Sequence, residues 1–434
     1  MIPPPPCVAA IDMGYGHLRP AAALAQEFGT VVSRGDRAPL ADARDRATLA
    51  GMHRLHVALS RATGARFVGP LMTRMLHSVT FIPRIRRRGE LSAPNAATRH
   101  LHGLIERGFG DVLVAHLKRV RVPLVSTYFA QAIVADAAGL ADVFCVATDS
   151  DVNRVWVSLD PGKSSIRYLV PMRRTARRLA CYGVDPARIH VTGFPLPPRL
   201  LGGPDLPVLE RHLGERLLRL DPGGAFRSQA PENLGRILSR AASGEASAPL
   251  RVTFAIGGAG AQTKLAGELL QALREPLARG TVHLTLVAGV RRDVARRLRA
   301  FVASHARTAT AIGAIEVLHD PTFEGYLRQF EDCLATTDVL WTKPSEMTFF
   351  AALGLPLVLA PPLGHHEIGN GAMARRKGFG LDGPDLRDVG RWLEAHLADG
   401  SLARAAWAGY TRMPKHGTYR ISALVRPPDA GPVR

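Results

Sequence analysis

The residue best suited to acid–base chemistry near the start of the chain is His17, at the end of Gly14-Tyr15-Gly16-His17. An imidazole can take a proton from a hydroxyl group at neutral pH. The apolar run at residues 7–12 and the helical spacing that follows predict a strand, a glycine turn and a helix. Such a turn lets a ligand approach the backbone closely. A histidine here also suits helix capping or packing, so the segment alone leaves both roles open.

A second glycine turn, with Gly257, Gly258 and Gly260, follows the apolar run at residues 251–256. Small residues allow the backbone to approach a phosphate group. The turn lacks the G-K-[ST] ending of a P-loop, which disfavours ATP hydrolysis. Tight packing of a strand against the next helix requires the same small residues, so phosphate binding is one of two interpretations.

Polar residues also follow the apolar run that ends at residue 341, in the segment Thr-Lys-Pro-Ser-Glu-Met-Thr at 342–348. The hydroxyl groups of Ser345 or Thr348, with the first amides of the helix expected at 349–353, could bind an anion. A diphosphate leaving group needs such stabilisation, because negative charge develops on it in the transition state. An ordinary helix N-cap with a nearby glutamate explains the segment equally well.

The segment Pro-Pro-Leu-Gly-His-His-Glu-Ile-Gly-Asn at 361–370 follows another buried run. Its His366, Glu367 and Asn370 side chains combine donors and acceptors at an expected helix start, a spacing suited to several hydroxyl groups of one sugar. Ligands of open α/β sheets bind at the carboxyl ends of the strands, which is where this segment falls. The alternative is a loop with a helix cap.

Apolar runs alternate with helical patterns along the chain, which predicts parallel sheets joined by right-handed crossovers. Strands are expected at 7–12, 124–128, 143–148, 251–256, 283–288, 315–318, 339–341 and 357–360, and helices at 265–273, 293–303 and 323–333. The strand–glycine–helix start occurs twice, near residues 7 and 251. The expected fold class is therefore α/β, with two doubly wound Rossmann-like domains facing a cleft.

The two starts also divide the chain. At roughly 150 residues per domain, 434 residues fit two or three domains. We expect an N-terminal Rossmann-like domain at 1–200, a connector or insertion of open membership at 201–249, a C-terminal domain at 250–400, and a tail at 401–434 that packs back on the first domain.

The charge of the chain is more unusual than its composition. Hydrophobic residues make up 46% and charged residues 21%, as in globular proteins. Lys plus Arg outnumber Asp plus Glu by 56 to 37, a net charge of +19, which attracts nucleic acid, anionic lipid or phosphorylated small molecules. Nucleic acid is the weakest of these expectations, because no RNA-binding or helix-turn-helix signature is present. No apolar run reaches the ~18–20 residues of a membrane span and no secretory signal is visible, so a cytoplasmic protein is expected.

In their order along the chain, these segments resemble a two-domain B-type (GT-B) glycosyltransferase. More narrowly, they resemble glycosyltransferase family 28, the group of diacylglycerol glycosyltransferases and the lipid-linked N-acetylglucosaminyltransferase of peptidoglycan synthesis. Ala-Thr-Asp-Ser at 147–150, with Trp156 shortly after, is similar to the group's T-D…W segment. DPARIHVTGFPL at 185–196 is similar to its P-x-R-I-x-V-T-G-x-P. The resemblance covers residues 7–30 and 140–380.

This resemblance implies transfer of a sugar from a nucleotide-sugar, usually a UDP-sugar, to a hydroxyl of a lipid or lipid carrier, with inversion and an oxocarbenium-like transition state. His17 would be the general base and Asp149 would act on the acceptor side. The donor would bind to Gly257, Gly258, Gly260, Ser345, Glu346, Thr348, His366, Glu367 and Asn370. The nucleotide-sugar is a substrate; no cofactor and no metal is expected, since helix amides would neutralise the diphosphate.

Two departures from the group's pattern bear on the donor. The glycine-rich G-x-x-T turn of the group is Ser345-Glu346-Met347-Thr348 here, and a carboxylate beside a diphosphate is unfavourable unless it points away or binds ribose hydroxyls. The glutamate that commonly follows the threonine by three residues is Ala351. These departures keep open two alternatives: a sugar-nucleotide 2-epimerase-like enzyme on the same architecture, and a non-catalytic nucleotide-sugar-binding protein.

Residues 65–88 mix apolar side chains with a basic cluster, Arg84, Arg86, Arg87 and Arg88. Enzymes of the group dock on the inner membrane leaflet through such a part of the first domain. The resemblance therefore implies peripheral binding to an anionic membrane surface, with Gly14 and Gly16 on the acceptor side. Each basic residue near such a surface contributes about 1 kcal/mol. A helix that packs in the core beside a solvated arginine turn is the alternative.

Overall fold

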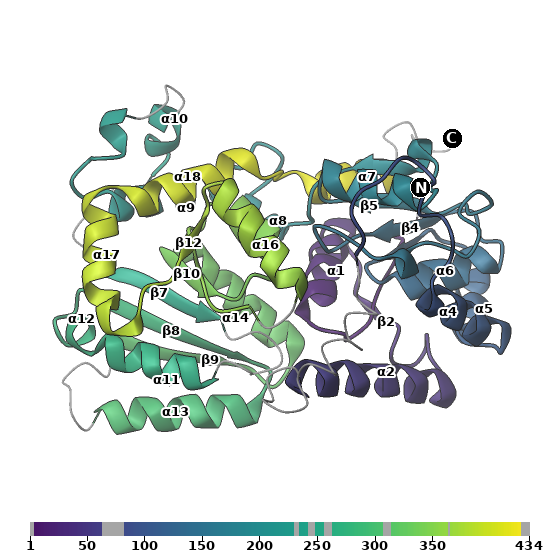
Figure 1. Ribbon diagram of the computed structural model, residues 1–434, viewed down its shortest axis with the longest axis horizontal. Helices are drawn as coiled ribbons and strands as arrows, with labels where there is room; N and C mark the ends of the chain where they lie inside the picture. Colours follow the sequence, from purple (N-terminus) through teal and green to yellow (C-terminus); the bar gives the residue numbers. More distant parts are fainter. Residues whose placement is uncertain are drawn as a thin grey trace. The chain divides into compact units, whose positions relative to one another are not determined.

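The computed structural model describes residues 4–62, 82–229, 234–241, 248–255, 263–306, 314–362 and 365–426, with the backbone alone at 55–62, 305–306 and 365–366. The chain forms two compact units (Figure 1). The first unit combines Met1–Pro198 with Pro414–Arg434, and the second unit is Arg199–Met413.

The first unit is built on a parallel six-stranded sheet with the order β2-β1-β3-β4-β5-β6. Its strands are β1 (Cys7–Ala10), β2 (Ser33–Arg34), β3 (Leu124–Ser126), β4 (Val143–Val146), β5 (Arg167–Val170) and β6 (Ile189–Val191). Its helices are α1 (Tyr15–Phe28), α2 (Ala43–Ala62), α4 (Ala96–Glu106), α5 (Asp111–Val120), α6 (Phe129–Ala137), α7 (Arg173–Cys181) and α19 (Gly417–Val425). Every residue of β1, β3 and β4 is buried, as expected for strands covered by helices on both faces.

The second unit is built on another parallel six-stranded sheet, with the order β12-β11-β10-β7-β8-β9. Its strands are β7 (Leu250–Ala255), β8 (Val282–Gly289), β9 (Ile315–His319), β10 (Val339–Thr342), β11 (Leu357–Leu359) and β12 (Gly380–Asp382). Its helices are α9 (Pro207–Leu220), α10 (Leu234–Leu238), α11 (Thr263–Ala272), α12 (Arg274–Ala278), α13 (Arg292–Ala306), α14 (Phe323–Thr336), α15 (Met347–Ala352), α16 (His365–Arg376), α17 (Val389–Ala398) and α18 (Ser401–Arg412), with α8 (Pro198–Leu201) at the junction. Figure 1 shows α11 and α13 along the lower side of β7, β8 and β9, and α9 and α18 along the upper side.

Both sheets are doubly wound, which confirms the expected α/β class with two Rossmann-like units. In the first unit the chain moves from β1 to β2 on one side and then to β3 on the other side of β1. In the second unit it runs from β7 through β8 to β9 and then returns to β10, next to β7. The strand order therefore reverses at β1/β3 and at β7/β10. Ligands of such sheets bind at the carboxyl ends of the strands at these reversal points.

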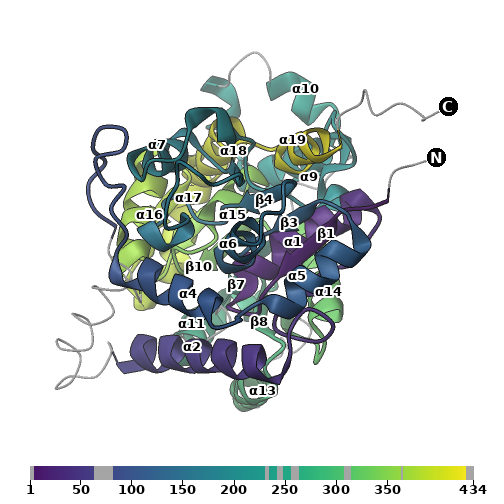
Figure 2. The same cartoon turned by 90° about the vertical axis from the view of Figure 1, so that its right-hand side faces the viewer.

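The unit boundaries differ from the expected domain limits. The segment 201–249, of open membership in the sequence, belongs to the second unit in its described part, where α9 packs against α14 and α18. The expected tail at 401–434 divides at residue 414: α18 stays in the second unit, and α19 packs on α1 of the first unit (Figure 2). This return requires a glycine, because a Cβ at Gly417 would lie 2.2 Å from the carbonyl oxygen of Phe194.

Among the described residues, no helix is both long and apolar enough to cross a membrane.

Candidate functional site

The first reversal point carries the predicted base, His17. It lies in the first turn of α1, just after the loop that leaves β1, and is partly buried. Gly14 starts this helix with φ 119°, a conformation that strains any residue with a Cβ. Gly14 therefore lets the helix start, and His17 with it, at the carboxyl edge of the sheet, and Gly16 lies in the first turn of the helix.

A hydrogen bond to the segment after the neighbouring strand, β3, fixes the imidazole of His17. Its Nδ1 donates a hydrogen bond to the carbonyl oxygen of Thr127, 2.8 Å away, directly after β3. The Thr127 hydroxyl donates to the carbonyl oxygen of His17 at 2.8 Å, and the Thr148 hydroxyl oxygen lies 3.3 Å from Nδ1. A neutral imidazole with its proton on Nδ1 carries a lone pair on Nε2. The geometry therefore sets the tautomer that a general base requires.

Aromatic rings surround this imidazole. Tyr128 meets it edge-on at 5.2 Å between ring centroids, and Trp156 lies 6.3 Å away. Phe129 completes the group, 4.5 Å from Tyr128 and 5.3 Å from Trp156. Burial raises the pKa of Tyr128 to about 12, so its phenol stays neutral near pH 7. The imidazole of His17 is therefore the candidate proton acceptor of this cluster.

Asp149 lies at the same edge, three residues after β4, and is exposed. Asp149 and Asp151 have a D-x-D spacing. The Asp151 carboxylate accepts hydrogen bonds from Arg178 Nε at 2.8 Å and Arg174 Nε at 3.0 Å. Asp151 therefore anchors this loop on α7. Among the described residues, no group of three or more His, Cys, Asp or Glu side chains is placed to hold a metal ion.

The second reversal point carries the loop after β10. Thr342, the last residue of the strand, pairs in register with Ala255 of β7, and its hydroxyl oxygen lies 3.4 Å from the Ala255 carbonyl oxygen. The predicted glycine loop with Gly257, Gly258 and Gly260 lies outside the described residues.

A half-buried ion pair holds this loop to α16. Lys343 Nζ lies 2.7 Å from Glu367 Oε1; the Glu367 side chain is 1% exposed and that of Lys343 is 22% exposed. Asn370 Nδ2 donates to the Pro344 carbonyl oxygen at 3.2 Å. The carboxylate and amide predicted to contact a sugar therefore contact the loop. The side chain of His366 lies outside the described set.

The other predicted donor residues surround this loop. Ser345 and Glu346 are partly buried, and Glu346 precedes α15 as its N-cap without a side-chain capping bond. Thr348 is 7% exposed inside α15, which has only six residues. So short a helix aligns few peptide dipoles, which weakens the anion site expected at its start.

The basic cluster lies at the opposite edge of the first sheet. Its four arginines are exposed, and the loop docks on the carboxyl end of α7, where Cys181 Sγ donates to the Arg86 carbonyl oxygen at 2.8 Å. Because α7 runs back from the carboxyl end of β5, its last residues reach the amino edge of the sheet. The cluster is therefore not brought next to His17. The apolar residues expected beside it at 65–81 lie outside the described residues, whereas Ile85 is 38% exposed.

The structure thus gathers the predicted residues into two groups. Gly14, Gly16, His17 and Asp149 share the carboxyl edge of the first sheet, and Ser345, Glu346, Thr348, Glu367 and Asn370 share that of the second. Thr148 and Lys343 stood in the sequence only as members of the segments 147–150 and 342–348, and Thr127 was missed. The available signal was the position of all three residues within two residues of the end of a buried strand.

Comparison with known proteins yields one family match and several similar structures. Residues 234–324, a part of the second unit, match a domain of unknown function (DUF6938). A search of curated proteins finds no match. Similar structures include the UDP-GlcNAc 2-epimerase of Neisseria meningitidis bound to UDP-GlcNAc, at 10% identity and a TM-score of 0.44 over 77% of this chain and 83% of that one. A co-structure of S. aureus MnaA with UDP has 10% identity and a TM-score of 0.48 over 96% and 95%. The glycosyltransferase SnogD of Streptomyces nogalater has 15% identity and a TM-score of 0.39 over 96% and 98%.

Proposed function

We propose that this chain is a glycosyltransferase that moves a sugar from a nucleotide-sugar, with a UDP-sugar as the expected donor, to the hydroxyl group of a lipid or lipid carrier. The observation that carries the proposal is the imidazole of His17, fixed by Thr127 at the first reversal point with its proton on Nδ1. Packing of the helix against the strand does not require a histidine whose ring is fixed by a hydrogen bond, so the arrangement favours a catalytic role for His17.

His17 acts as the general base in this proposal. Nε2 takes the proton of the acceptor hydroxyl while the oxygen of that hydroxyl forms a bond to the anomeric carbon. The bond between the anomeric carbon and the diphosphate oxygen breaks, and its electron pair leaves with the nucleoside diphosphate. Inversion at the anomeric carbon follows from this single displacement. The Thr127 carbonyl oxygen, which accepts from Nδ1, stabilises the imidazolium that forms.

The second unit holds the donor in this proposal. Its polar loop after β10 lies at the β7/β10 reversal, the position at which Rossmann-type sheets bind nucleotides. The loop supplies a hydroxyl (Ser345), a carboxylate (Glu346) and an ammonium group (Lys343) within four residues. This set suits a ligand that has both hydroxyl and phosphate groups.

The proposal of a lipid acceptor rests on the charge of the basic cluster, which would contact the membrane and does not lie beside His17. Four exposed arginines, Arg84, Arg86, Arg87 and Arg88, follow one another with the exposed Ile85 between them. Basic side chains around an apolar one favour the surface of an anionic bilayer, from which a lipid hydroxyl would be taken.

The experiment is release of UDP from UDP-glucose, UDP-galactose or UDP-N-acetylglucosamine, with and without anionic vesicles that contain diacylglycerol or a polyprenyl phosphate. The proposal predicts that release from one donor depends on one lipid and yields a glycolipid. Conversion of the UDP-sugar to an epimer without lipid would support the epimerase alternative instead. Binding of donor without turnover on any acceptor would support a non-catalytic binding protein.

A further inference from the structure

The ion pair between Lys343 and Glu367 joins two elements at the second reversal point. Lys343 follows β10 directly, and Glu367 lies in the first turn of α16. Nζ and Oε1 are 2.7 Å apart. The carboxylate is 1% exposed, whereas the lysine side chain, at 22%, still reaches solvent. The pair is therefore asymmetric: a hidden anion holds an accessible cation.

Stability alone is a weak reason for this arrangement. A carboxylate that is almost fully buried loses its hydration, and its attraction to a cation often only balances that cost. Apolar residues of similar volume would pack the junction at least as well. What the ion pair provides is a fixed position for the ammonium group of Lys343 at the edge of the sheet.

A second contact fixes the backbone of the same loop. Asn370 is one helical turn after Glu367, so both side chains lie on one face of α16. Its amide donates to the Pro344 carbonyl oxygen at 3.2 Å, and the Ser345 amide donates to the Lys343 carbonyl oxygen at 2.7 Å. The loop is thus tied to α16 at Pro344, and the bond between Ser345 and Lys343 closes the turn within the loop. The position of the ammonium group follows from that of α16.

The chemistry of the ammonium group identifies its ligand. An ammonium group has three N–H donors and one of them meets Glu367, which leaves two for an anion. Lysine binds phosphate as a point charge. Glu346, in the same loop, adds a negative charge that disfavours a bare anion, and the hydroxyl of Ser345 can form hydrogen bonds with hydroxyl groups. The combination suits a phosphate that is attached to a hydroxyl-bearing group, as in a nucleoside diphosphate.

We infer that Lys343 binds the diphosphate of the nucleotide-sugar and that Glu367 is a positioning residue, which acts through Lys343 and does not touch the sugar. This inference rests on the proposed function, because it assigns a residue to the donor site. In the transfer step the bond between the anomeric carbon and the diphosphate oxygen breaks, and its electron pair stays on the oxygen. The ammonium group of Lys343 stabilises the negative charge that develops there.

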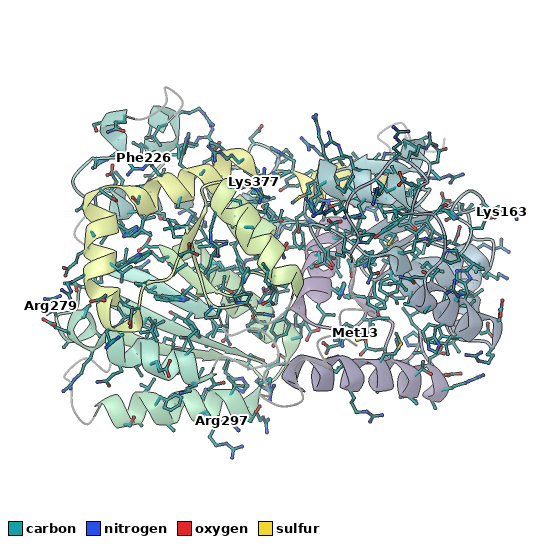
Figure 3. All side chains as sticks on the ribbon, in the orientation of Figure 1. Met13, Lys163, Phe226, Arg279, Arg297 and Lys377 are labelled. Carbon is teal, nitrogen blue, oxygen red and sulfur yellow. The ribbon has the colours of Figure 1, made fainter. Side chains whose placement is uncertain are left out.

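The test is calorimetric binding of UDP and of uridine to the full-length protein and to variants. Lys343→Met is expected to weaken UDP binding about tenfold or more and to leave uridine binding unchanged, because uridine has no phosphate. Glu367→Gln is expected to weaken UDP binding by a smaller factor, again without effect on uridine. Lys377→Met, at the other end of α16, is the matched control and should bind both ligands as the wild type does (Figure 3).

The double variant Lys343→Met/Glu367→Gln guards against misfolding, because Lys343→Met alone leaves a buried carboxylate without its cation. If Glu367 acts through Lys343, the double variant binds UDP as weakly as Lys343→Met and no weaker. A Lys343→Met or double variant that binds UDP like the wild type overturns the inference and leaves the proposed function standing. A further loss in the double variant overturns the positioning role. A wild-type protein that binds neither UDP nor any UDP-sugar overturns the proposed function as well.

Discussion

Among single residues, His17 carries the chemistry of the proposal and is the one to replace first. His17→Ala is expected to lower the rate of sugar transfer by about 10²–10⁴, because the acceptor hydroxyl loses its general base. Donor affinity should stay unchanged, since the substitution removes no group of the second unit. Transfer would be followed by UDP release and donor affinity by calorimetry.

A suitable control for this substitution is His396→Ala. His396 also donates from Nδ1 to a carbonyl oxygen, that of Trp392 at 2.8 Å, but it lies on α17, which directly follows none of the strands at the reversal points. It should transfer sugar at the wild-type rate. Full activity of His17→Ala would remove the imidazole from the mechanism.

The sequence indicates which residues are candidates for each site, but it does not indicate which other residues they contact. His17 stands out because a glycine turn and a helix follow a buried strand. Its partner Thr127 is 110 positions away, and their contact depends on the pairing of β1 with β3, which no local pattern encodes. Glu367 was expected to meet a sugar; only the structure shows that α16 turns it toward Lys343.

At the scale of the elements, His212 on α9 predicts how the stability of the second unit depends on pH. Burial, with Arg216 and Arg211 nearby, lowers the pKa of His212 from 6.5 to about 4. The folded state therefore binds this proton less readily than the unfolded state, and stability is lost as the pH falls from about 6.5 towards 4. Between pH 7 and pH 5.5 this group alone should cost the second unit about 1 kcal/mol.

Urea unfolding of wild type and His212→Gln at the two pH values would measure this cost. The variant should lose about 1 kcal/mol less than the wild type on acidification. His283→Gln, on an exposed position of β8, is the control and should behave like the wild type. Equal losses in wild type and His212→Gln would mean that the proton-binding difference lies elsewhere.

The central elements were predictable because their strands are continuous apolar runs. The expected strands at 7–12 and 251–256 correspond to β1 and β7 within two residues. The edge strands β2 and β6 have half-exposed or exposed residues and were missed. The central strand β5 was missed as well, although its last three residues are buried, because the strand is short and begins at Arg167. The membership of α9 was hidden for another reason: its fully buried Arg216 donates to the carbonyl oxygens of Leu334, Thr337, Leu353 and Gly354, partners that the sequence does not reveal.

At the scale of the whole molecule, a net charge of +19 would attract any anionic surface. A test of membrane binding must therefore separate binding at the basic cluster from attraction by the total charge. Replacement of Arg84, Arg86, Arg87 and Arg88 by Gln is expected to lower binding to anionic vesicles by on the order of 10², since each basic residue contributes about 1 kcal/mol. Ion pairs of Arg86 with Glu90 and of Arg88 with Asp185, both 3.7 Å, reduce the full effect. Vesicle sedimentation would measure it.

The control removes four charges elsewhere. Arg292, Arg296, Arg297 and Arg299 are exposed on α13, from which Arg297 points outward in Figure 3. Their replacement by Gln should reduce vesicle binding much less than replacement of the basic cluster. Equal losses would show that binding follows net charge and that the basic cluster is not a membrane site.

The division of the chain was predictable only in part. Two strand–glycine–helix starts indicated two doubly wound units, and both sheets are present. The return of residues 414–425 to the first unit depends on long-range packing of α19 on α1, and no pattern in the tail separates α18 from it.

Release of UDP by the wild-type protein from a UDP-sugar, with and without lipid acceptor vesicles, tests the proposed glycosyltransferase activity. A glycosyltransferase with a lipid acceptor should release UDP only when the lipid is present, form a glycolipid product, and lose both activities in His17→Ala. UDP-sugar epimerisation without lipid, or bound donor that no acceptor turns over, would contradict the proposed activity.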